Sequence, residues 1–216
     1  MRYLGYDNSM IKAAVFLADG FEEIEALTVV DYLRRAECDV SMIAVPVATM
    51  KALNMPTGAH GITVSADCGL EEYLAGLQDT LPDCVYVPGG MPGAANVGAE
   101  HRVIKFIQKC YEAGKLISAI CAAPAVVLAK TGILAGHKYT CYPGMEEGII
   151  DYCGNSENMM KCMKNSMLVR NVPFITDGTI VTGRGPGCAE QFAMELVRIL
   201  FGEKTAGRIH DCSIQR

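Results

Sequence analysis

Cys121 is the residue of this sequence best placed to act as a nucleophile. It lies in the run "LISAICAAPAVVLAKTGIL", where an apolar stretch typical of a strand meets small, helix-forming residues. The flanking alanines, Ala122 among them, allow a tight turn, and Pro124 suits the first turn of a helix because its nitrogen needs no hydrogen-bond partner. Free amides and the dipole at a helix N-terminus stabilise a thiolate. Position alone equally fits a small buried core residue.

Glu25 is a carboxyl group on a helix face that turns toward the protein interior. The segment 21–35 has helical spacing, and a wheel at 100° per residue places Glu25 among apolar neighbours that include Val29, Leu33 and Ala36. Burial raises the pKa of a carboxyl group, and a protonated Glu can donate a hydrogen bond to a nearby thiolate. The alternative is a Glu at the edge of the apolar stripe that reaches solvent.

Two glycine-containing segments could supply backbone contacts to a ligand. "VPGG" ends in Gly89 and Gly90, and the Gly90 amide could join the Ala122 amide in holding a developing oxyanion. An ordinary turn at the end of a strand is the alternative. "GRGPG", which contains Arg184, precedes the last long helix, but no Lys-Ser/Thr follows and the dinucleotide fingerprint is incomplete. We therefore do not expect nucleotide binding.

The elements around these residues alternate between strand and helix patterns. Short apolar runs predict strands at 13–18, 39–45, 84–87, 115–120 and 138–142, and a hairpin at 172–183 that turns at Asp177 and Gly178. Helical patterns cover 21–35, 70–77, 102–114 and 188–201, whereas 143–165 reads as an irregular polar section. This alternation predicts an α/β fold with a mainly parallel sheet. Ligands bind beyond the carboxyl ends of such strands, which is where Cys121 falls.

Length and charge narrow the class of protein. The 216 residues are 50% hydrophobic and carry a formal net charge of -5, which predicts one domain over residues 10–216 without a basic face for nucleic acid or anionic lipid. No apolar run approaches the roughly 20 residues of a membrane span, and the start lacks the apolar core of a signal peptide. We expect a cytoplasmic protein. Residues 1–9 should form a flexible tail, unless Met10 is the true start.

The ten cysteines are expected to be reduced rather than paired in disulfides, because no secretion signal is present and the core is large. The sequence contains no CxxC pair, and its four histidines do not lie near cysteines at the short intervals that zinc sites use. We expect neither a bound metal nor a cofactor.

Five motifs, taken together, resemble the ThiJ/PfpI superfamily, and specifically its parkinsonism-associated protein deglycase branch. They are "LADGFEEIEALTVVDYLRRA", "VPGGMPGAANV", "ISAICAAP", "KYTCYPGMEE" and "GTIVTGRGPG", and the resemblance covers residues 13–202. It implies a flavodoxin-like three-layer α/β sandwich, a homodimer, Cys121 as the reactive cysteine and Glu25 as its partner acid. Gly90 and Ala122 match the positions whose amides face the cysteine. Further pocket candidates are Gly89, Tyr142, Pro143 and Arg184.

Two positions depart from related patterns. The protease-like branch has a His directly after the cysteine, and here that residue is Ala122, so a Cys-His peptidase mechanism lacks its base. Animal members of the deglycase branch carry a His before the Pro of the segment that matches "CYP", where this chain has Tyr142. A role assigned to that His does not transfer to this protein.

Two classes of function fit these residues. The first is an enzyme of the glyoxalase or deglycase type that acts on small dicarbonyls or glycated adducts, with Cys121 attacking carbon and Glu25 moving protons. The second is a non-enzymatic sensor of oxidative stress, or a chaperone, in which Cys121 is oxidised to a sulfinate held by Glu25, without a disulfide.

We predict that Cys121 is the most reactive of the ten thiols, because it combines a helix N-terminus, a ligand-facing strand end and a carboxyl partner. Limited alkylation with iodoacetamide at near-neutral pH, followed by peptide mapping, measures this. Preferential alkylation of Cys110, Cys141 or Cys188 would contradict it.

Overall fold

The computed structural model describes residues 10–215, apart from positions 49, 51, 78 and 79. Residues 1–9, for which we expect a flexible tail, lie outside the described residues. Among the described residues, no helix is both long and apolar enough to cross a lipid bilayer.

A seven-stranded sheet forms the centre of the protein, with the strand order β3-β2-β1-β4-β5-β9-β8. Neighbouring strands are parallel except for β8 and β9, which form an antiparallel pair. The order β2-β1-β4-β5-β9 is that of a flavodoxin-like fold, so the predicted mainly parallel α/β architecture is confirmed. The strands are β1 (Lys12–Leu17), β2 (Asp39–Ala44), β3 (Cys68–Gly69), β4 (Cys84–Val87), β5 (Leu116–Ile120), β8 (Phe174–Asp177) and β9 (Ile180–Gly183).

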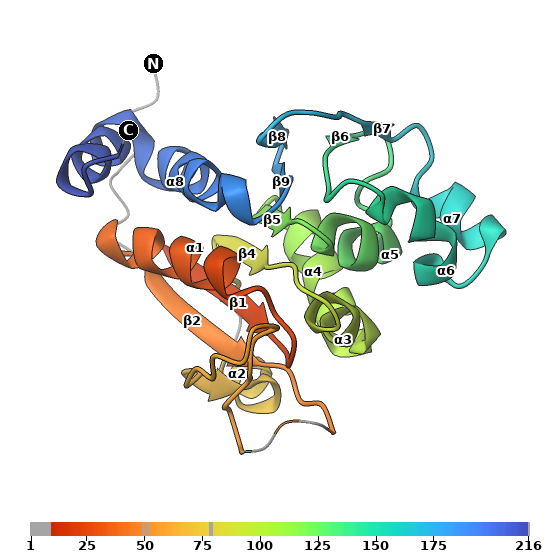
Figure 1. Ribbon diagram of the computed structural model, residues 1–216, viewed down its shortest axis with the longest axis horizontal. Helices are drawn as coiled ribbons and strands as arrows, with labels where there is room; N and C mark the ends of the chain where they lie inside the picture. The colour runs from red at the N-terminus through yellow and green to blue at the C-terminus, as the bar shows by residue number, and fades with distance from the viewer. Residues whose placement is uncertain (1–9, 49, 51, 78–79, 216) are drawn as a thin grey trace.

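Helices cover both faces of the sheet and complete three layers (Figure 1). One face carries α1 (Glu23–Arg35) and α8 (Ala189–Cys212), the latter interrupted at Gly202. The other face carries α2 (Leu70–Gly76), α3 (Gly93–Ala99), α4 (His101–Glu112) and a helical segment made of the π-helical turn η1 (Pro124–Leu128) and α5 (Ala129–Thr131).

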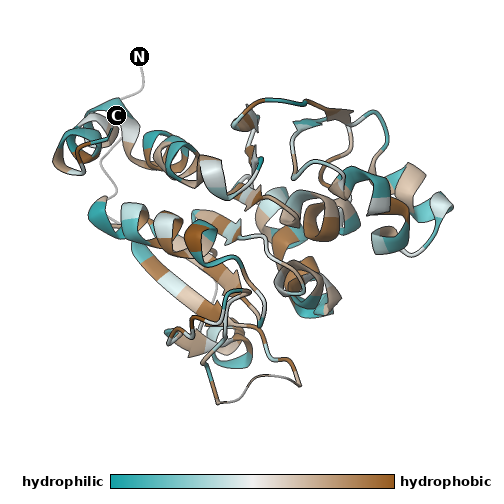
Figure 2. Ribbon diagram, viewed as in Figure 1, coloured by the Kyte–Doolittle hydropathy of each residue, from teal (hydrophilic) through white to brown (hydrophobic). Residues whose placement is uncertain are grey.

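Both faces of the parallel strands are apolar because both are covered. Along β1, Phe16 packs toward α2 and α4, whereas Val15 and Leu17 pack toward α1 and α8. Figure 2 shows this as hydrophobic colouring along the central strands, with hydrophilic residues along the outer sides of helices such as α1. The continuous apolar runs of the sequence therefore belong to strands buried on both faces.

One region differs from its sequence-based prediction. The predicted strand at 138–142 is limited to β6 (Lys138–Tyr139), which pairs with β7 (Met167–Leu168) in a separate two-stranded sheet. The section 143–165 is not irregular, since it contains the 3-10 turn η2 (Met145–Gly148), α6 (Ile149–Cys153) and α7 (Ser156–Cys162). These helices are too short for a clear 3.6-residue pattern. The hairpin of β8 and β9 is confirmed.

Local side-chain contacts explain how such a short helix forms. Asn155 precedes α7, and its side-chain oxygen accepts a hydrogen bond from the Asn158 amide at 2.8 Å. This N-cap satisfies an amide that would otherwise be unpaired in the first turn. Partly buried Tyr152 and Met159 then pack against the same core cluster as the helices that cover the sheet.

An aromatic cluster joins the sheet to its outer layer. The ring of Phe16, which is fully buried, makes edge-to-face contacts with Tyr73 of α2 and Phe106 of α4, at centroid distances of 6.4 and 5.8 Å. Such pairs contribute about 0.5–1.5 kcal/mol each beyond the burial of their area.

We predict that Phe16→Ala lowers the free energy of unfolding by about 3–5 kcal/mol, because it removes a buried ring and leaves a cavity between β1, α2 and α4. Urea denaturation measures the change. Leu53→Ala, at a position 88% exposed, is the control and should change stability by less than about 0.5 kcal/mol. Equal effects of the two substitutions would contradict the packing described here.

Candidate active site

Four neighbouring strands deliver the candidate residues to one edge of the sheet. β1, β4, β5 and β9 are adjacent and parallel, so their carboxyl ends lie together. Glu25 lies in the first turn of α1, after β1 and a short loop, and Gly89 and Gly90 follow β4. Cys121 follows β5 directly and Arg184 follows β9. Residues nearly 160 positions apart in the chain are thereby brought to one place.

Cys121 occupies a sharp turn between β5 and the helical segment that begins at Pro124. Its φ of 63° lies in the left-handed region, which costs a non-glycine residue about 1–3 kcal/mol. The Cys121 amide donates to the Gly183 carbonyl at 2.9 Å, and the Cys121 carbonyl accepts from the Tyr142 amide at 2.8 Å. These two bonds hold the strained backbone, so the half-buried thiol leaves the sheet in a defined direction.

Glu25 is fully buried on the inner face of α1, directly beside this turn. Its Oε2 accepts a hydrogen bond from the Gly89 amide at 2.8 Å, and its backbone carbonyl accepts one from the Tyr86 hydroxyl at 3.0 Å. Oε1 is buried and makes no hydrogen bond with a nitrogen or oxygen atom of the described residues. The carboxyl group also interacts with the Cys121 thiol.

Gly89 lies between Cys121 and Glu25, where the backbone passes very close to both side chains. A Cβ at Gly89 would lie 2.5 Å from the Cβ of Cys121 and 2.7 Å from Oε2 of Glu25. Real carbon atoms do not approach so closely, so glycine alone fits between the cysteine and the carboxyl group. Gly89 thus allows the close approach and also donates a hydrogen bond to Glu25. Its role in a ligand pocket stays a prediction.

Burial controls the protonation of the pair. It raises the pKa of Glu25 to about 7, against the opposing effect of the Gly89 amide. The pKa of the Cys121 thiol is raised too, first by burial and second by the nearby Glu25 carboxylate. The Gly90 and Ala122 amides lower it. Two adjacent negative charges in this buried place are unfavourable, so the pair retains one proton near neutral pH. The Glu25 carboxylate raises the Cys121 pKa, so the proton lies on the sulfur when Glu25 is ionised. Protonation of Glu25 removes that effect and leaves the Gly90 and Ala122 amides to favour a thiolate.

The remaining pocket candidates lie together in one open cavity. Tyr142, Pro143 and Arg184 line one open cavity of about 520 Å³, together with Gly185 and Cys188. The Tyr142 amide donates a hydrogen bond to the Cys121 carbonyl. Arg184 directly follows Gly183, whose carbonyl accepts a hydrogen bond from the Cys121 amide. A ligand in this cavity would meet an aromatic ring and a guanidinium group.

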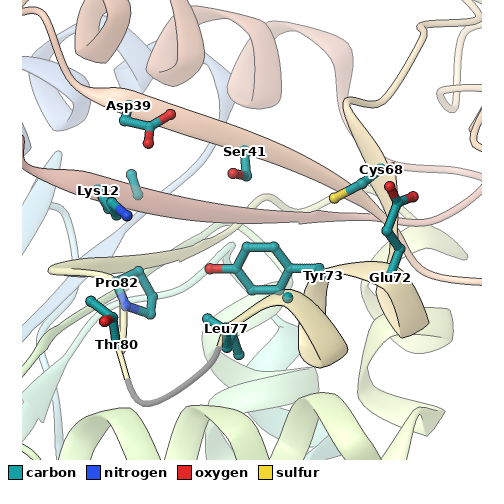
Figure 3. A pocket seen from close by; sticks show the side chains of 11 residues that line it. Lys12, Asp39, Ser41, Cys68, Glu72, Tyr73, Leu77, Thr80 and Pro82 are labelled. Carbon is teal, nitrogen blue, oxygen red and sulfur yellow. The ribbon is translucent and has the colours of Figure 1, made fainter.

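A second cavity, of about 330 Å³, lies at the opposite edge of the sheet (Figure 3). Lys12 and Asp39, the first residues of β1 and β2, line it, and the Tyr73 side chain extends into it from α2. Strands begin rather than end here, and none of the candidate residues contributes to it. It is therefore separate from the cysteine site.

One group of side chains among the described residues has atoms placed as metal ligands could be. Atoms of Glu22, Glu23 and His60 lie within 4.8 Å of one another. The Glu23 carboxylate already accepts from the backbone amides of His60 and Ile62 at 2.7 and 3.4 Å, and it contacts His60 Nδ1 at 2.9 Å. These contacts fasten the loop around His60 to the start of α1, which is a structural role.

Two residues of the site had not been predicted. The Tyr86 hydroxyl orients the first turn of α1 from inside the sheet, and the Gly183 carbonyl receives the Cys121 amide. Tyr86 belongs to an apolar strand, "CVYV", in which a tyrosine hydroxyl needs a buried partner. The sequence therefore signals that the Tyr86 hydroxyl has a buried partner, but it does not show which residue that partner is.

We predict that stability depends on pH through Glu25. Its pKa in the folded protein, about 7, exceeds the usual 4.5, so its burial costs nothing below pH 4.5 and becomes destabilising as pH rises to about 7. The test compares two proteins that both carry Cys121→Ser, one with Glu25 and one with Glu25→Gln. The unfolding free energy of the first minus that of the second should fall by up to about 3 kcal/mol between pH 4.5 and about 7, and stay level at higher pH. Other acids cancel in the difference. A pH-independent difference in urea unfolding would contradict the assignment.

Comparisons with known proteins agree with this arrangement. Residues 11–199 match the DJ-1/PfpI family. A zebrafish (Danio rerio) relative named Parkinson disease protein 7 homolog is 33% identical, over 92% of this chain and 94% of its own length. A deglycase-named protein of Pyrococcus abyssi is 25% identical, over 88% of this chain and 99% of its own length. The solved structure of a DJ-1 superfamily protein from Salmonella typhimurium is 32% identical, with a TM-score of 0.78 over 96% of this chain and all of that one.

Some relatives are much longer than this chain. Protein DJ-1 homolog B of Arabidopsis thaliana is 31% identical over 97% of this chain, which spans 42% of that relative. Homolog A is 30% identical, and this chain spans 45% of its length. The match nevertheless extends over nearly all of the described fold, and the chain belongs to the DJ-1/PfpI family.

Proposed function

We propose that the protein removes small reactive dicarbonyls, or the early adducts they form with amines and thiols, by covalent catalysis at Cys121. The observation that carries the proposal is the contact between a strained, half-buried cysteine and a fully buried Glu25 whose pKa is raised to about 7. A proton donor and acceptor poised near neutral pH beside a thiol suits chemistry at a carbonyl carbon. The deglycase name of one relative is consistent with it.

The first step requires a thiolate and a proton donor together. The Cys121 thiolate attacks the aldehyde carbon, a carbon–sulfur bond forms, and the carbonyl oxygen receives the proton of Glu25. The amides of Gly90 and Ala122, which face the sulfur, stabilise the negative charge before the attack and are near the oxygen as it develops. The product is a hemithioacetal.

The second step uses the ionised Glu25. Its carboxylate removes the proton from the carbon bound to sulfur and returns it to the neighbouring carbonyl carbon. The hydroxyl proton of the hemithioacetal passes to the neighbouring oxygen, which leaves a 2-hydroxy thioester. Water then attacks the thioester, the carbon–sulfur bond breaks and the thiol is regenerated. The sum for methylglyoxal is one dicarbonyl plus one water to one lactate and one proton, without an external oxidant or reductant. For a glycated adduct, the same attack would release the amine.

Arg184 and Tyr142 are proposed to select the substrate. Both line one open cavity, Tyr142 is hydrogen-bonded through its amide to the Cys121 carbonyl, and the Arg184 guanidinium is suited to a second carbonyl or a carboxylate product. The position after Cys121 is Ala122, so the imidazole that a Cys-His peptidase needs is absent there. We therefore do not propose peptidase activity.

A homodimer in the cytoplasm is part of the same proposal. Ile24 and Leu27 expose apolar side chains on the outer side of α1, and Met91 does so after β4, close to the residues of the site. Such a grouping of exposed apolar side chains is typical of a contact surface. A reducing compartment would keep the Cys121 thiol available.

A redox sensor is the second candidate, and one contact favours it. The carboxyl group of Glu25 interacts with the sulfur of Cys121, so its protonated form could donate a hydrogen bond to an oxygen of a sulfinate formed there. This function requires no turnover of substrate. The following measurement separates the two.

We predict that metal-stripped protein converts methylglyoxal to lactate, that Cys121→Ser lowers kcat/KM by at least about 100-fold, and that Glu25→Gln lowers it by about 10²-fold or more. Cys68→Ser, at a half-buried cysteine of the separate second cavity, is the control and should retain most activity. Lactate is measured by enzymatic assay. Absence of turnover in the unmodified protein, with Cys121 still oxidised by dilute peroxide, would favour the sensor instead.

A further inference from the structure

A second pair of thiols lies away from the candidate active site. Cys153 ends α6 and Cys162 ends α7, and these short helices pack against each other and against α5. Both cysteines line one open cavity of about 360 Å³. The Cys162 thiol is also among the groups that raise the pKa of Cys153. Two cysteines nine positions apart in the sequence are thus brought to the same cavity.

A lysine amine lies beside the pair. Lys130 lines the same cavity, its Nζ donates to the Gly98 carbonyl at 3.0 Å, and partial burial lowers its pKa. Its positive charge acts on Cys153 and lowers the pKa of that thiol, against the larger effect of burial. The Cys162 thiol approaches the backbone carbonyl of Lys130 at 3.9 Å. Lys130 therefore shares the cavity with both cysteines, and its charge partly offsets the burial that raises the pKa of Cys153.

Access distinguishes this pair from cysteines of the core. Cys153 and Cys162 are half-buried, whereas Cys84 and Cys110 are fully buried. The chain between the two cysteines contains Gly154 at a φ of 88°, so α6 and α7 are separated by a turn rather than by one rigid helix. A small oxidant can reach the sulfurs, and the helices can adjust to a covalent bond.

We propose that Cys153 and Cys162 form a redox-active dithiol that closes to an intramolecular disulfide on reaction with a hydroperoxide, independently of Cys121. The ten cysteines are free in this structure, as expected for the reduced protein, and the proposal concerns the oxidised state of this pair. The proposal does not rest on the function proposed for the active site.

The reaction balances with the peroxide as the oxidant. The Cys153 thiolate attacks one peroxide oxygen, the oxygen–oxygen bond breaks, and the other oxygen leaves as water or an alcohol after taking a proton. The resulting sulfenic acid is attacked by the Cys162 sulfur, a sulfur–sulfur bond forms, and the sulfur–oxygen bond breaks to release water. Two electrons pass from the two thiols to the peroxide.

The disulfide would restrain the helices that pack against the segment after Cys121. α6 and α7 pack on α5 and on the segment that begins at Pro124, three residues after Cys121. A bond between the two helices would restrict their separation. Oxidation in this part of the fold is therefore a modification distinct from sulfinate formation at Cys121.

The test uses the full chain with Cys121→Ser, so that oxidation at the active site cannot contribute. Dilute hydrogen peroxide followed by intact-mass spectrometry should show a loss of two hydrogens that dithiothreitol reverses. Trypsin cleaves after Lys161, so Cys153 and Cys162 fall in different peptides, 139–161 and 162–164, which should be found linked. Fragmentation must assign the bond to Cys153, because the first peptide also holds Cys141.

Matched variants complete the test. Cys153→Ser and Cys162→Ser should each abolish the loss of two hydrogens, whereas Cys68→Ser and Cys188→Ser, at other half-buried cysteines, should retain it. Phenylarsine oxide, which bridges two adjacent thiols, should add once to the Cys121→Ser protein and not after the disulfide has formed, which tests proximity without relying on the folding of a variant. Separate oxidation of each thiol to a sulfinic acid, or a bond that survives in both serine variants, would overturn the proposal.

Discussion

The buried carboxyl group of Glu25 is the constraint around which the site is arranged. A carboxyl group removed from water favours its protonated form, and here it receives one amide hydrogen bond, from Gly89, while lying against the thiol of Cys121. Its pKa of about 7 follows from that burial. A proton that is shared between a carboxyl group and a thiol can be passed to or from a substrate, which an exposed glutamate would not do at neutral pH.

This arrangement depends on close backbone approach, and close approach depends on small residues. A side chain at Gly89 would overlap both Cys121 and Glu25, so the absence of a Cβ is what lets β4 and the turn after β5 come together. The strain at Cys121 is held by hydrogen bonds to Gly183 and Tyr142, which come from different parts of the chain. The surrounding sheet thus maintains a turn that an isolated peptide would not adopt.

The same sheet gives the protein two separate regions of sulfur chemistry. Cys121 lies at the carboxyl ends of the strands, whereas the thiols of Cys153 and Cys162 lie on the outer helices α6 and α7. Their surroundings differ in charge, because Glu25 accompanies the first and Lys130 the second. A carboxyl group can move a proton to a substrate, and an ammonium group stabilises a thiolate that reacts with an oxidant.

Sequence patterns determined the parallel α/β fold and favoured an inward-facing Glu25, because continuous apolar runs mark doubly buried strands and a helical wheel shows which side of α1 turns inward. They did not reveal α6 and α7, since helices this short carry almost no periodic signal. The close approach of Glu25 to Cys121, the partners of Tyr86 and Gly183, and the shared cavity of Cys153 and Cys162 were decided only by the tertiary structure. Each joins segments whose separation in the chain is unrelated to their distance in space, so no local pattern encodes them.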